Sequence, residues 1–374
     1  MNTYSYNIPN ILATVPHILG YYPERSFVLC TVSLVDRDCP EIAQRGEGTT
    51  IIGPIGRVDL EDHDAAEMLL DRLPYEPTDV LIGINVGPAE PDLFRRVRDR
   101  VDHFLFTDSL KPGTVCDDVL DTQSPLGTVG KPFASVLAHS SPPAENRESF
   151  MCLYRGVNTE ITAQARGNLR KQAQARSLDR DKALHPSSDN TSELVDIERG
   201  LAGDEIMLSM SFHLTRLDEA SQEDIAKDKS ALLCALSMLE DVLSRDLIML
   251  FALMKGTAAP FSKLMLAAAE TLHTVVTPGP NTKNYPRWRA QQYRRANALS
   301  LYALSMITLS QPSHALAALR VALETSPGHS LSQLLLGVMS EGQYMHLLQT
   351  TANAVEDLIT KSCLSYRPSL PILT

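Results

Sequence analysis

The stretch that decides the fold runs from Ala296 to His329 and reads ANALSLYALSMITLSQPSHALAALRVALETSPGH. Small and large apolar residues recur in it at the three- and four-residue spacings of helices that pack together. Alanines at the crossing points let two helix backbones approach closely, while larger side chains fill the grooves on either side. Pro327 closes the unit, because proline cannot continue a helix. The stretch therefore predicts a helical hairpin, which serves packing and partner docking and carries no catalytic signature.

The offsets within the hairpin follow the tetratricopeptide (TPR) pattern. The matching residues are Leu299, Tyr302, Ala303, Met306, Ala315, Leu319, Ala322 and Pro327. Leu336 and Gly337 repeat the Leu-Gly pair of a second unit, which Gly342 and Gln343 interrupt. A continuous superhelical core needs about three repeats. One TPR-like hairpin at 296–329 within a helical bundle is therefore the prediction, and a true peptide-binding array is the alternative.

Length and composition describe an ordinary globular chain. Its 374 residues allow two or three domains, and 44% hydrophobic with 21% charged residues are typical globular values. The N-terminus lacks the basic and apolar regions of a signal peptide, and no apolar run reaches the roughly 18 residues that a membrane span needs. We therefore expect a soluble, cytoplasmic protein with no membrane partner.

Chemical signatures are sparse. The 6 cysteines include no Cys-x-x-Cys pair, which argues against a zinc site and a disulfide framework. The glycine-rich phosphate loops, the His-Glu-x-x-His zinc motif and the Gly-x-Ser-x-Gly nucleophile motif are also missing. The sequence thus predicts no metal, no cofactor and no catalytic residue, and it leaves enzymatic activity uncertain with non-catalytic function favoured.

The N-terminal part alternates helix-like and strand-like patterns. Helical spacing is found in Ile8–Leu19, Asp62–Leu73 and Pro91–Val101, and strand-like runs in Ser26–Val35, Thr49–Asp59, Asp79–Val86 and His103–Thr107. The order strand, helix, strand, helix, strand from Thr49 onward implies right-handed crossovers. We therefore predict an α/β domain over residues 1–143, with a mixed, mainly parallel sheet and flanking helices. Its last part, Asp121–Pro143, is rich in proline and glycine and is expected to be a loop.

Helical patterns dominate the remainder. The sequence predicts a helical connector and acidic linker over 144–204, followed by a mostly helical domain over 205–374. Asn146–Leu184 is expected to be helical, with a largely polar surface that carries Arg166, Arg170, Lys171, Arg176 and Arg180. Ser221 is expected to cap a long helix or two joined helices that extend to Lys255, and a further helix is expected at Pro260–Val276.

Several short motifs resemble those of one bacterial family. They are Ile11-Leu12-Ala13, Val15-Pro16, Leu19-Gly20, Pro23-Glu24-Arg25-Ser26, Arg57-Val58-Asp59-Leu60, Ser124-Pro125 leading to Arg147-Glu148, and Ala318–Leu335 with Pro327-Gly328-His329. Together they resemble the family called domain of unknown function 4192, over most of the chain. Some members of that family carry a cysteine cluster near the position of Cys116, which this chain lacks. Because the family has no established activity, the resemblance implies an architecture and supplies no mechanism.

A small-ligand site is expected where parallel strands end, because ligands bind outside the carboxyl ends of the strands in open α/β sheets. Arg57 and Asp59 lie at the end of the second predicted strand, and Asp108 follows the fourth. Carboxylates that converge there can hold a magnesium ion, and Arg57 can pair with a phosphate. Aspartate is also common where a strand enters a turn or a helix, so a structural role in turns and caps is the alternative.

A partner-binding surface is expected in the basic stretch 283–295. It interleaves cationic and aromatic side chains: Arg287, Trp288, Arg289, Tyr293, Arg294 and Arg295. No acidic residue occurs from Thr271 to Leu323, whereas Asp189–Asp246 is strongly acidic. Three readings remain: docking of an acidic protein or of the chain's own acidic region, a solvated helix flank with buried aromatic rings, or nucleic-acid binding. The net charge of −11 makes nucleic acid the least favoured.

The sequence thus favours a non-catalytic protein-interaction or regulatory module. The alternative is an enzyme or a nucleotide or small-molecule sensor with a site at the carboxyl edge of the N-terminal sheet.

Overall fold

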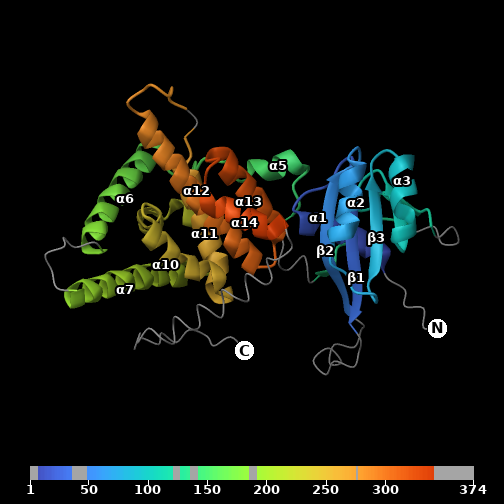
Figure 1. The fold of residues 1–374 in the computed structure, drawn as a ribbon, viewed down its shortest axis with the longest axis horizontal. Helices are drawn as coiled ribbons and strands as arrows, with labels where there is room; N and C mark the ends of the chain where they lie inside the picture. The colour runs from blue at the N-terminus through green and yellow to red at the C-terminus, as the bar shows by residue number, and fades with distance from the viewer. Residues whose placement is uncertain are drawn as a thin grey trace. The chain divides into compact units, whose positions relative to one another are not determined.

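The computed structural model describes residues 7–35, 49–120, 127–134, 142–184, 192–274 and 277–340. The chain forms two compact units: the first ends at Phe150, and the second begins at Met151 (Figure 1). The first is an α/β unit built on one sheet, and the second is a helical unit. The predicted order, an α/β part followed by a mostly helical part, is therefore confirmed. Residues 185–191 of the predicted linker, and Gly342 and Gln343, lie outside the described residues.

The α/β unit contains a mixed sheet of 6 strands in the order β2-β1-β3-β4-β5-β6. The strands are β1 (Ser26–Val35), β2 (Thr49–Asp59), β3 (Val80–Val86), β4 (His103–Thr107), β5 (Val115–Asp118) and β6 (Gly127–Thr128). The helices are α1 (Ile8–Leu19), α2 (His63–Arg72), α3 (Pro91–Val97) with a 3-10 turn at Arg98–Arg100, and α5 (Arg147–Cys152). The two last strands were not predicted, and β6 falls within the stretch expected to be a loop.

The sheet is mixed, as predicted, but it is not mainly parallel. Strands β2, β3 and β4 run in the same direction, yet only β3 and β4 pair as parallel neighbours. The reason is that β1 inserts between β2 and β3 and is antiparallel to both. Strands β5 and β6 add further antiparallel pairs. Local patterns show where strands are, but they do not show which strand enters the middle of a sheet.

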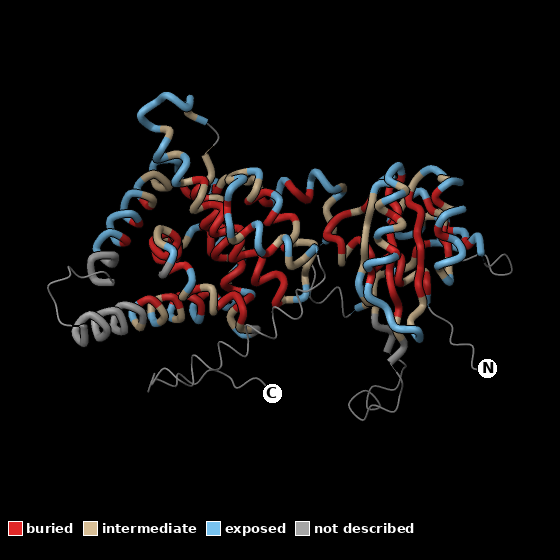
Figure 2. Tube along the Cα trace, in the orientation of Figure 1, coloured by how far each residue is buried: buried red, intermediate tan, exposed pale blue. Residues whose placement is uncertain are grey.

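The strands of the sheet are buried along much of their length (Figure 2), and their side chains contribute to apolar layers on both faces of the sheet. Phe27 and Phe104 stack across β3 at a ring-centroid distance of 6.0 Å, on the face that α2 and α3 cover. Gly83 lies between them, and a Cβ there would come within 3.1 Å of the Phe27 ring. Glycine therefore leaves room for this aromatic contact, and a Cβ at this position would push against both rings. Alternate residues such as Val28 and Ile84 are buried on the opposite face, where α1 lies (Figure 1).

The helical unit contains nine helices within its described residues. They are α6 (Ala163–Leu184), α7 (Ser192–Leu217), α8 (Gln222–Lys227), α9 (Lys229–Met238), α10 (Val242–Leu253), α11 (Lys255–Leu272), α12 (Tyr285–Thr308), α13 (Pro312–Thr325) and α14 (Ser330–Ser340). Helix α12 is central and packs against α10, α11, α13 and α14. Alanines such as Ala298 and Ala318 are fully buried where these helices approach closely.

Several predicted helices are divided in the structure. The helical stretch expected over Asn146–Leu184 is interrupted after α5, where Asn158 uses its side chain to donate to the carbonyl of Ala226 at 2.9 Å. Ser221 caps α8 as predicted, by accepting from the Asp224 amide. Asp228 and Asp241 then cap α9 and α10. Because aspartate caps a helix by accepting from backbone N–H groups, these residues start new helices within the segment that was expected to be one or two.

The segment Pro327-Gly328-His329 has a structural role. The His329 side chain is fully buried and its Nε2 lies 2.8 Å from Asn297 Oδ1, while its Nδ1 accepts from the Ser332 amide at the start of α14. Arg245 of α10 also donates to Asn297 Oδ1, at 3.1 Å. One buried polar network thereby joins α10, α12 and α14.

Candidate functional site

The three residues predicted at the sheet edge lie along one edge but do not converge. Asp59, Ser26, Val86 and Thr107 are aligned in one row across β2, β1, β3 and β4. Asp108 follows Thr107, so three strand spacings separate it from Asp59. At about 4.8 Å per spacing this places their backbones roughly 14 Å apart. A single magnesium ion cannot be bound by both carboxylates in this arrangement.

Arg57 and Asp59 are close and pair with each other. The Arg57 Nη2 atom lies 2.5 Å from Asp59 Oδ1, and Arg57 Nε donates to the hydroxyl of Ser26 at 2.7 Å. The Arg57 side chain is only 14% exposed, whereas that of Asp59 is 59% exposed. Arg57 therefore links β2 to β1 and is already neutralised by its neighbour. Asp108 is exposed.

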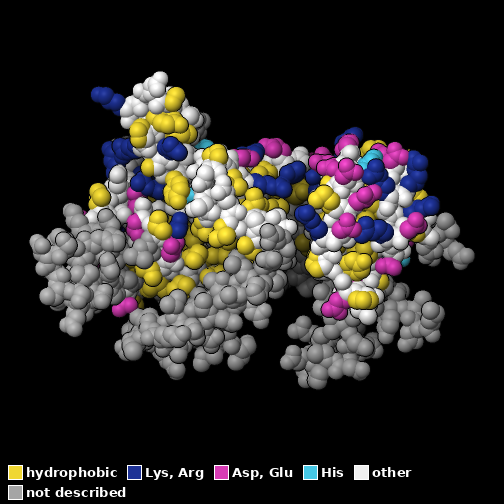
Figure 3. All heavy atoms as spheres, viewed as in Figure 1, with side chains coloured by type: hydrophobic (Ala, Val, Ile, Leu, Met, Phe, Trp, Pro, Cys, Tyr) yellow, Lys and Arg dark blue, Asp and Glu magenta, His cyan; other side chains and the backbone are white. Residues whose placement is uncertain are grey.

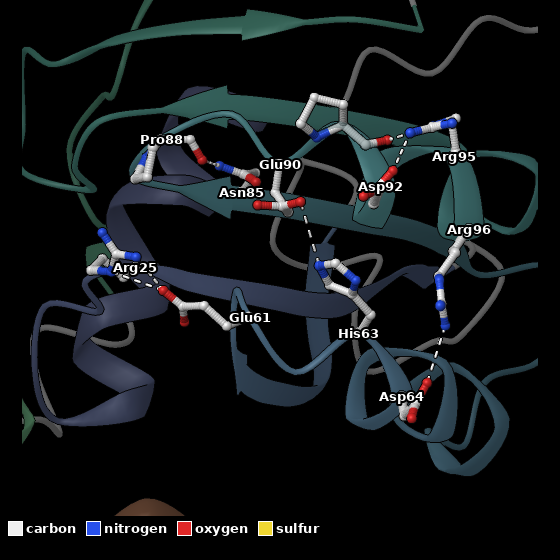
Figure 4. Close-up of polar contacts among 11 residues, drawn as sticks. Arg25, Glu61, His63, Asp64, Asn85, Pro88, Glu90, Asp92, Arg95 and Arg96 are labelled. Atoms are coloured by element: carbon white, nitrogen blue, oxygen red, sulfur yellow. Dashed lines mark hydrogen bonds and ion pairs between the residues drawn. The ribbon is translucent and has the colours of Figure 1, made fainter.

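A hollow of ≈ 380 Å³ opens between the beginnings of α2 and α3, at the same edge of the sheet. Its lining residues, His63, Asp92, Arg95 and Arg96, were not predicted from the sequence. The fold positions them because α2 follows β2 and α3 follows β3 (Figure 4). The signal in the sequence is that acidic and basic residues crowd the first turns of both helices.

The groups around the hollow are paired with one another. Arg96 Nη1 lies 3.1 Å from Asp64 Oδ1, and His63 Nε2 lies 3.5 Å from Glu90 Oε1 (Figure 4). Arg95 pairs with Asp92 within α3. These are mostly exposed contacts between opposite charges, which hold α2 against α3 but leave little net charge for a ligand.

Two buried side-chain atoms in this area lack a hydrogen-bond partner among the described residues: His63 Nε2, which lies 3.5 Å from Glu90 Oε1, and Asn85 Oδ1. Asn85, at the end of β3, is 0% exposed, and its Oδ1 atom accepts nothing. Its Nδ2 atom donates to the carbonyl of Pro88 at 3.0 Å (Figure 4). The turn is made possible by Gly87, whose φ of 110° is unfavourable for other residues. Asn85 therefore retains an unused acceptor at the sheet edge.

Nucleophilic and metal chemistry find little support in the described residues. Burial raises the pKa of both the Cys30 and the Cys116 thiol to about 12, so both are protonated and unreactive at neutral pH. Within the described ranges, no three His, Cys, Asp or Glu side chains gather in a way that would hold a metal ion.

Two arginines of the predicted partner-binding stretch are structural. Arg295 is only 3% exposed, and it donates to Thr325 Oγ1 and to the carbonyl of Tyr154, both at 2.7 Å. Burial lowers its pKa to about 10. Arg294 lies 2.5 Å from Glu240, within the predicted acidic stretch of the same unit. Neither guanidinium is presented to an external partner. They point inward because the stretch continues into the buried half of α12.

The aromatic residues of the stretch also pack internally. Tyr293 contacts the His329 ring edge-to-face at a centroid distance of 4.7 Å. Trp288 stacks on Tyr285 at 5.6 Å, and its indole N–H finds no acceptor among the described residues. The side chains of Trp288 and Tyr293 belong to residues that are half-buried.

Arg287 and Arg289 remain exposed at the start of α12. Arg287 lies close enough to Arg170 of α6 for its charge to act there: burial lowers the pKa of the Arg170 guanidinium, and the charges of Arg166 and Arg287 lower it further. Dark blue atoms of Lys and Arg gather where α6 and the start of α12 meet (Figure 3). The sequence signal for this cluster is that residues 163–178 and 271–323 both lack Asp and Glu. What periodicity does not reveal is that the fold brings the two segments together.

Comparison with known proteins identifies the family. The model of the family described as domain of unknown function (DUF4192) matches residues 9–344, so the chain belongs to that family. No curated protein and no solved structure was found to match the chain. Among the described residues, no helix is both long and apolar enough to cross a membrane.

Proposed function

We propose that this member of the DUF4192 family is a non-catalytic, cytoplasmic interaction module whose helical unit docks an acidic partner protein. The docking surface, called the basic face below, consists of Arg166, Arg170 and Arg287, together with the exposed Lys171 and Arg289 next to them in the sequence. One observation carries the proposal. Arg166, Arg170 and Arg287 gather from two helices, and no carboxylate of the described residues forms an ion pair with any of them.

Electrostatics supports docking at this face over the sheet edge. Gathered guanidinium groups repel one another, and a complementary acidic surface relieves that repulsion. At the sheet edge, Arg57, Arg95 and Arg96 are each neutralised by a carboxylate within the unit. The basic face is therefore the surface with charge left for a partner.

The hairpin of α12 and α13 supports the same function. We propose that it is TPR-like, since buried Ala303 and Ala315 occupy crossing positions of that pattern. Helix α12 packs on four helices through its buried part from Gln292 onward, and this holds the helix whose first turns carry Arg287 and Arg289. Less entropy is then lost when a partner binds.

Charge reversal tests the docking surface. The double variant Arg287→Glu, Arg289→Glu changes two exposed residues that hold no ion pair among the described residues, so it is expected to fold normally. When the wild-type protein is captured from its own cells at low salt, an acidic partner protein should be retained with it. The double variant should lose this partner. Quantitative affinity capture with mass spectrometry measures this difference.

A matched control separates a local effect from a change of net charge. Arg72→Glu with Lys131→Glu changes the same number of charges on exposed residues of the α/β unit. This control should retain the partner. Equal retention by all three proteins, or equal loss in both variants, would contradict the proposal.

A second candidate function is a small-molecule or nucleotide sensor at the sheet edge. The observation that favours it is the buried, unused acceptor of Asn85 at the end of β3, the strand that leads into α3 at one side of the hollow. A ligand that donates a hydrogen bond there should raise the melting temperature of the wild type but not of Asn85→Leu. Screening a nucleotide and metabolite library by thermal shift, with both proteins, checks this alternative.

A further inference from the structure

We propose that Arg166, Arg170 and Arg287 form a binding site for a phosphate group carried on a partner protein, as on a phosphorylated serine or threonine. The inference rests on the proposed function, in that the site lies within the basic face, and it specifies which chemical group that face recognises. Its support comes from how the three guanidinium groups are held, from the charge around them and from the chain's overall charge.

Two of the three arginines are held in place by the backbone. Arg166 Nη1 donates to the carbonyl of Ile161 at 2.8 Å and to the carbonyl of Asn158, a residue that is only 2% exposed. One turn further along α6, Arg170 Nε donates to the carbonyl of Arg166 at 3.2 Å. Both side chains are half-buried and use only part of their five N–H donors. The remaining donors are held in place without a carboxylate.

The third arginine approaches from another helix. Arg287 is exposed at the first turn of α12, close enough for its charge to act on Arg170. The nearest acidic residue before α6 in the sequence is Glu160. It forms an ion pair with Lys227, in which Oε2 lies 3.5 Å from Nζ. Three positive charges thus gather with no ion-pair partner among the described residues, in a region where Figure 3 shows dark blue atoms of Lys and Arg.

A phosphate monoester matches this arrangement better than a carboxylate does. At neutral pH it carries about two negative charges on three acceptor oxygens, whereas a carboxylate carries one charge on two. Guanidinium groups bind phosphate oxygens through paired N–H donors, and arginine clusters are the usual means of recognising phosphorylated segments. A carboxylate would neutralise only one of the three charges.

The protein-borne source is favoured over nucleic acid by charge. The whole chain carries −11, which repels a long polyanion, but it does not prevent one phosphate from reaching a local cationic cluster. In addition, Trp288 and Tyr285, the aromatic rings nearest to Arg287 in the sequence, are stacked on each other. They are therefore not arranged to stack on successive bases.

The test compares three versions of one short fluorescent peptide, with serine, glutamate or phosphoserine at the same position. Binding to the full chain is measured by fluorescence anisotropy at about pH 7.5, where phosphoserine is mostly dianionic. We expect the phosphoserine peptide to bind about tenfold more tightly than the glutamate peptide. Inorganic phosphate should displace it, while an equal ionic strength of chloride should not.

Variants locate the site without disturbing the anchor at Arg166. Arg287→Gln and Arg170→Gln should each weaken binding of the phosphoserine peptide by about tenfold or more, the usual effect of losing a charge-assisted contact. Arg287→Lys should restore only part of the affinity, because lysine keeps the charge and loses the paired donors. Arg72→Gln, in the α/β unit, should have no effect.

Other outcomes overturn the inference in distinguishable ways. Equal binding of the glutamate and phosphoserine peptides would remove the phosphate specificity but leave docking of an acidic partner intact. Tighter binding of a short single-stranded oligonucleotide than of the phosphopeptide, lost in Arg287→Gln, would assign the site to nucleic acid instead. No binding of the phosphopeptide would refute the site, while the proposed docking function would still be judged by the charge-reversal capture.

Discussion

In the α/β unit arginines meet carboxylates at the surface, whereas in the helical unit Arg245 and Arg295 lie in the interior. The core between the sheet, α2 and α3 is built mainly from apolar side chains, with Asn85 as a buried polar residue on the same face of the sheet. The helical interior contains polar networks, such as the one around His329 and Asn297, and titratable groups whose pKa values are shifted by burial. Both units have apolar cores, but the helical unit also buries polar networks, and the two units leave different groups available on their surfaces.

The difference also explains where a partner is expected to bind. Surface ion pairs in the α/β unit satisfy the charges of its sheet edge internally. In the helical unit, the internal networks use Arg294 and Arg295, and the arginines of the basic face are left without carboxylates. Three changes test this comparison.

The largest effect is expected in the apolar core of the α/β unit. Phe104 is 0% exposed and contacts Phe27, Phe94 and Phe106. Phe104→Ala should lower the free energy of unfolding of this unit by about 3–5 kcal/mol, because it removes buried apolar surface and leaves a cavity. Hydrogen exchange of peptides from β1 and β3 measures the loss. The effect should be the same at acidic and alkaline pH, and a strong pH dependence would contradict an apolar core.

A pH-dependent effect is expected at Glu270 of the helical unit. Burial raises the pKa of its carboxyl from 4.5 to about 7, although the nearby Arg295 opposes this shift. Because the folded pKa is raised, the contribution of Glu270 to stability is fully present below pH 4.5 and is lost as the pH rises through 7. The loss amounts to about 3 kcal/mol at most.

Glu270→Gln should remove this loss. The variant should be more stable than the wild type at about pH 8 and similar to it at about pH 4.5, since the wild-type side chain is then largely neutral. Denaturant unfolding followed by fluorescence reports on the helical unit alone, because Trp288 is the only tryptophan. A variant that is equally or less stable at the alkaline pH would show that Glu270 is not held in a desolvating environment.

The smallest effect is expected at the surface of the α/β unit. Arg96 lies 3.1 Å from Asp64 and 3.2 Å from Glu67, but its side chain is 42% exposed. Arg96→Ala should therefore change the free energy of unfolding by no more than about 0.5–1 kcal/mol. Hydrogen exchange in α2 and α3 measures the change. A loss as large as that in Phe104→Ala would show that ion pairs, and not apolar packing, hold the two helices on the sheet.

The sequence predicts the elements of the α/β unit closely, since β1, β2, β4 and α1 begin and end where their patterns indicate. Alternating or continuous apolar runs are local signals, and here tertiary contacts agree with them. The position of β1 between β2 and β3 is a long-range pairing that no local pattern contains. In the helical unit, Asn158 interrupts a helical pattern through distant contacts with Ala226 and Thr271. Such contacts depend on the complete fold.

The candidate sites show the same limit. The basic stretch was recognised by its composition, but α12 turns Arg295 into the interior and pairs Arg294 with Glu240. Only Arg287 and Arg289 of its arginines stay exposed. The partners of Arg287 in the basic face, Arg166 and Arg170, come from a segment more than a hundred residues earlier, and only the folded chain brings them together.

The central claim is that the helical unit, through its basic face, binds a protein. Native mass spectrometry of the full chain purified from its own cells at low salt tests it most directly, with a denatured aliquot to identify what is bound. We predict a complex with an acidic protein in the wild type and none in Arg287→Glu, Arg289→Glu. A retained small molecule without any protein, or a protein retained equally by that variant, would contradict the account.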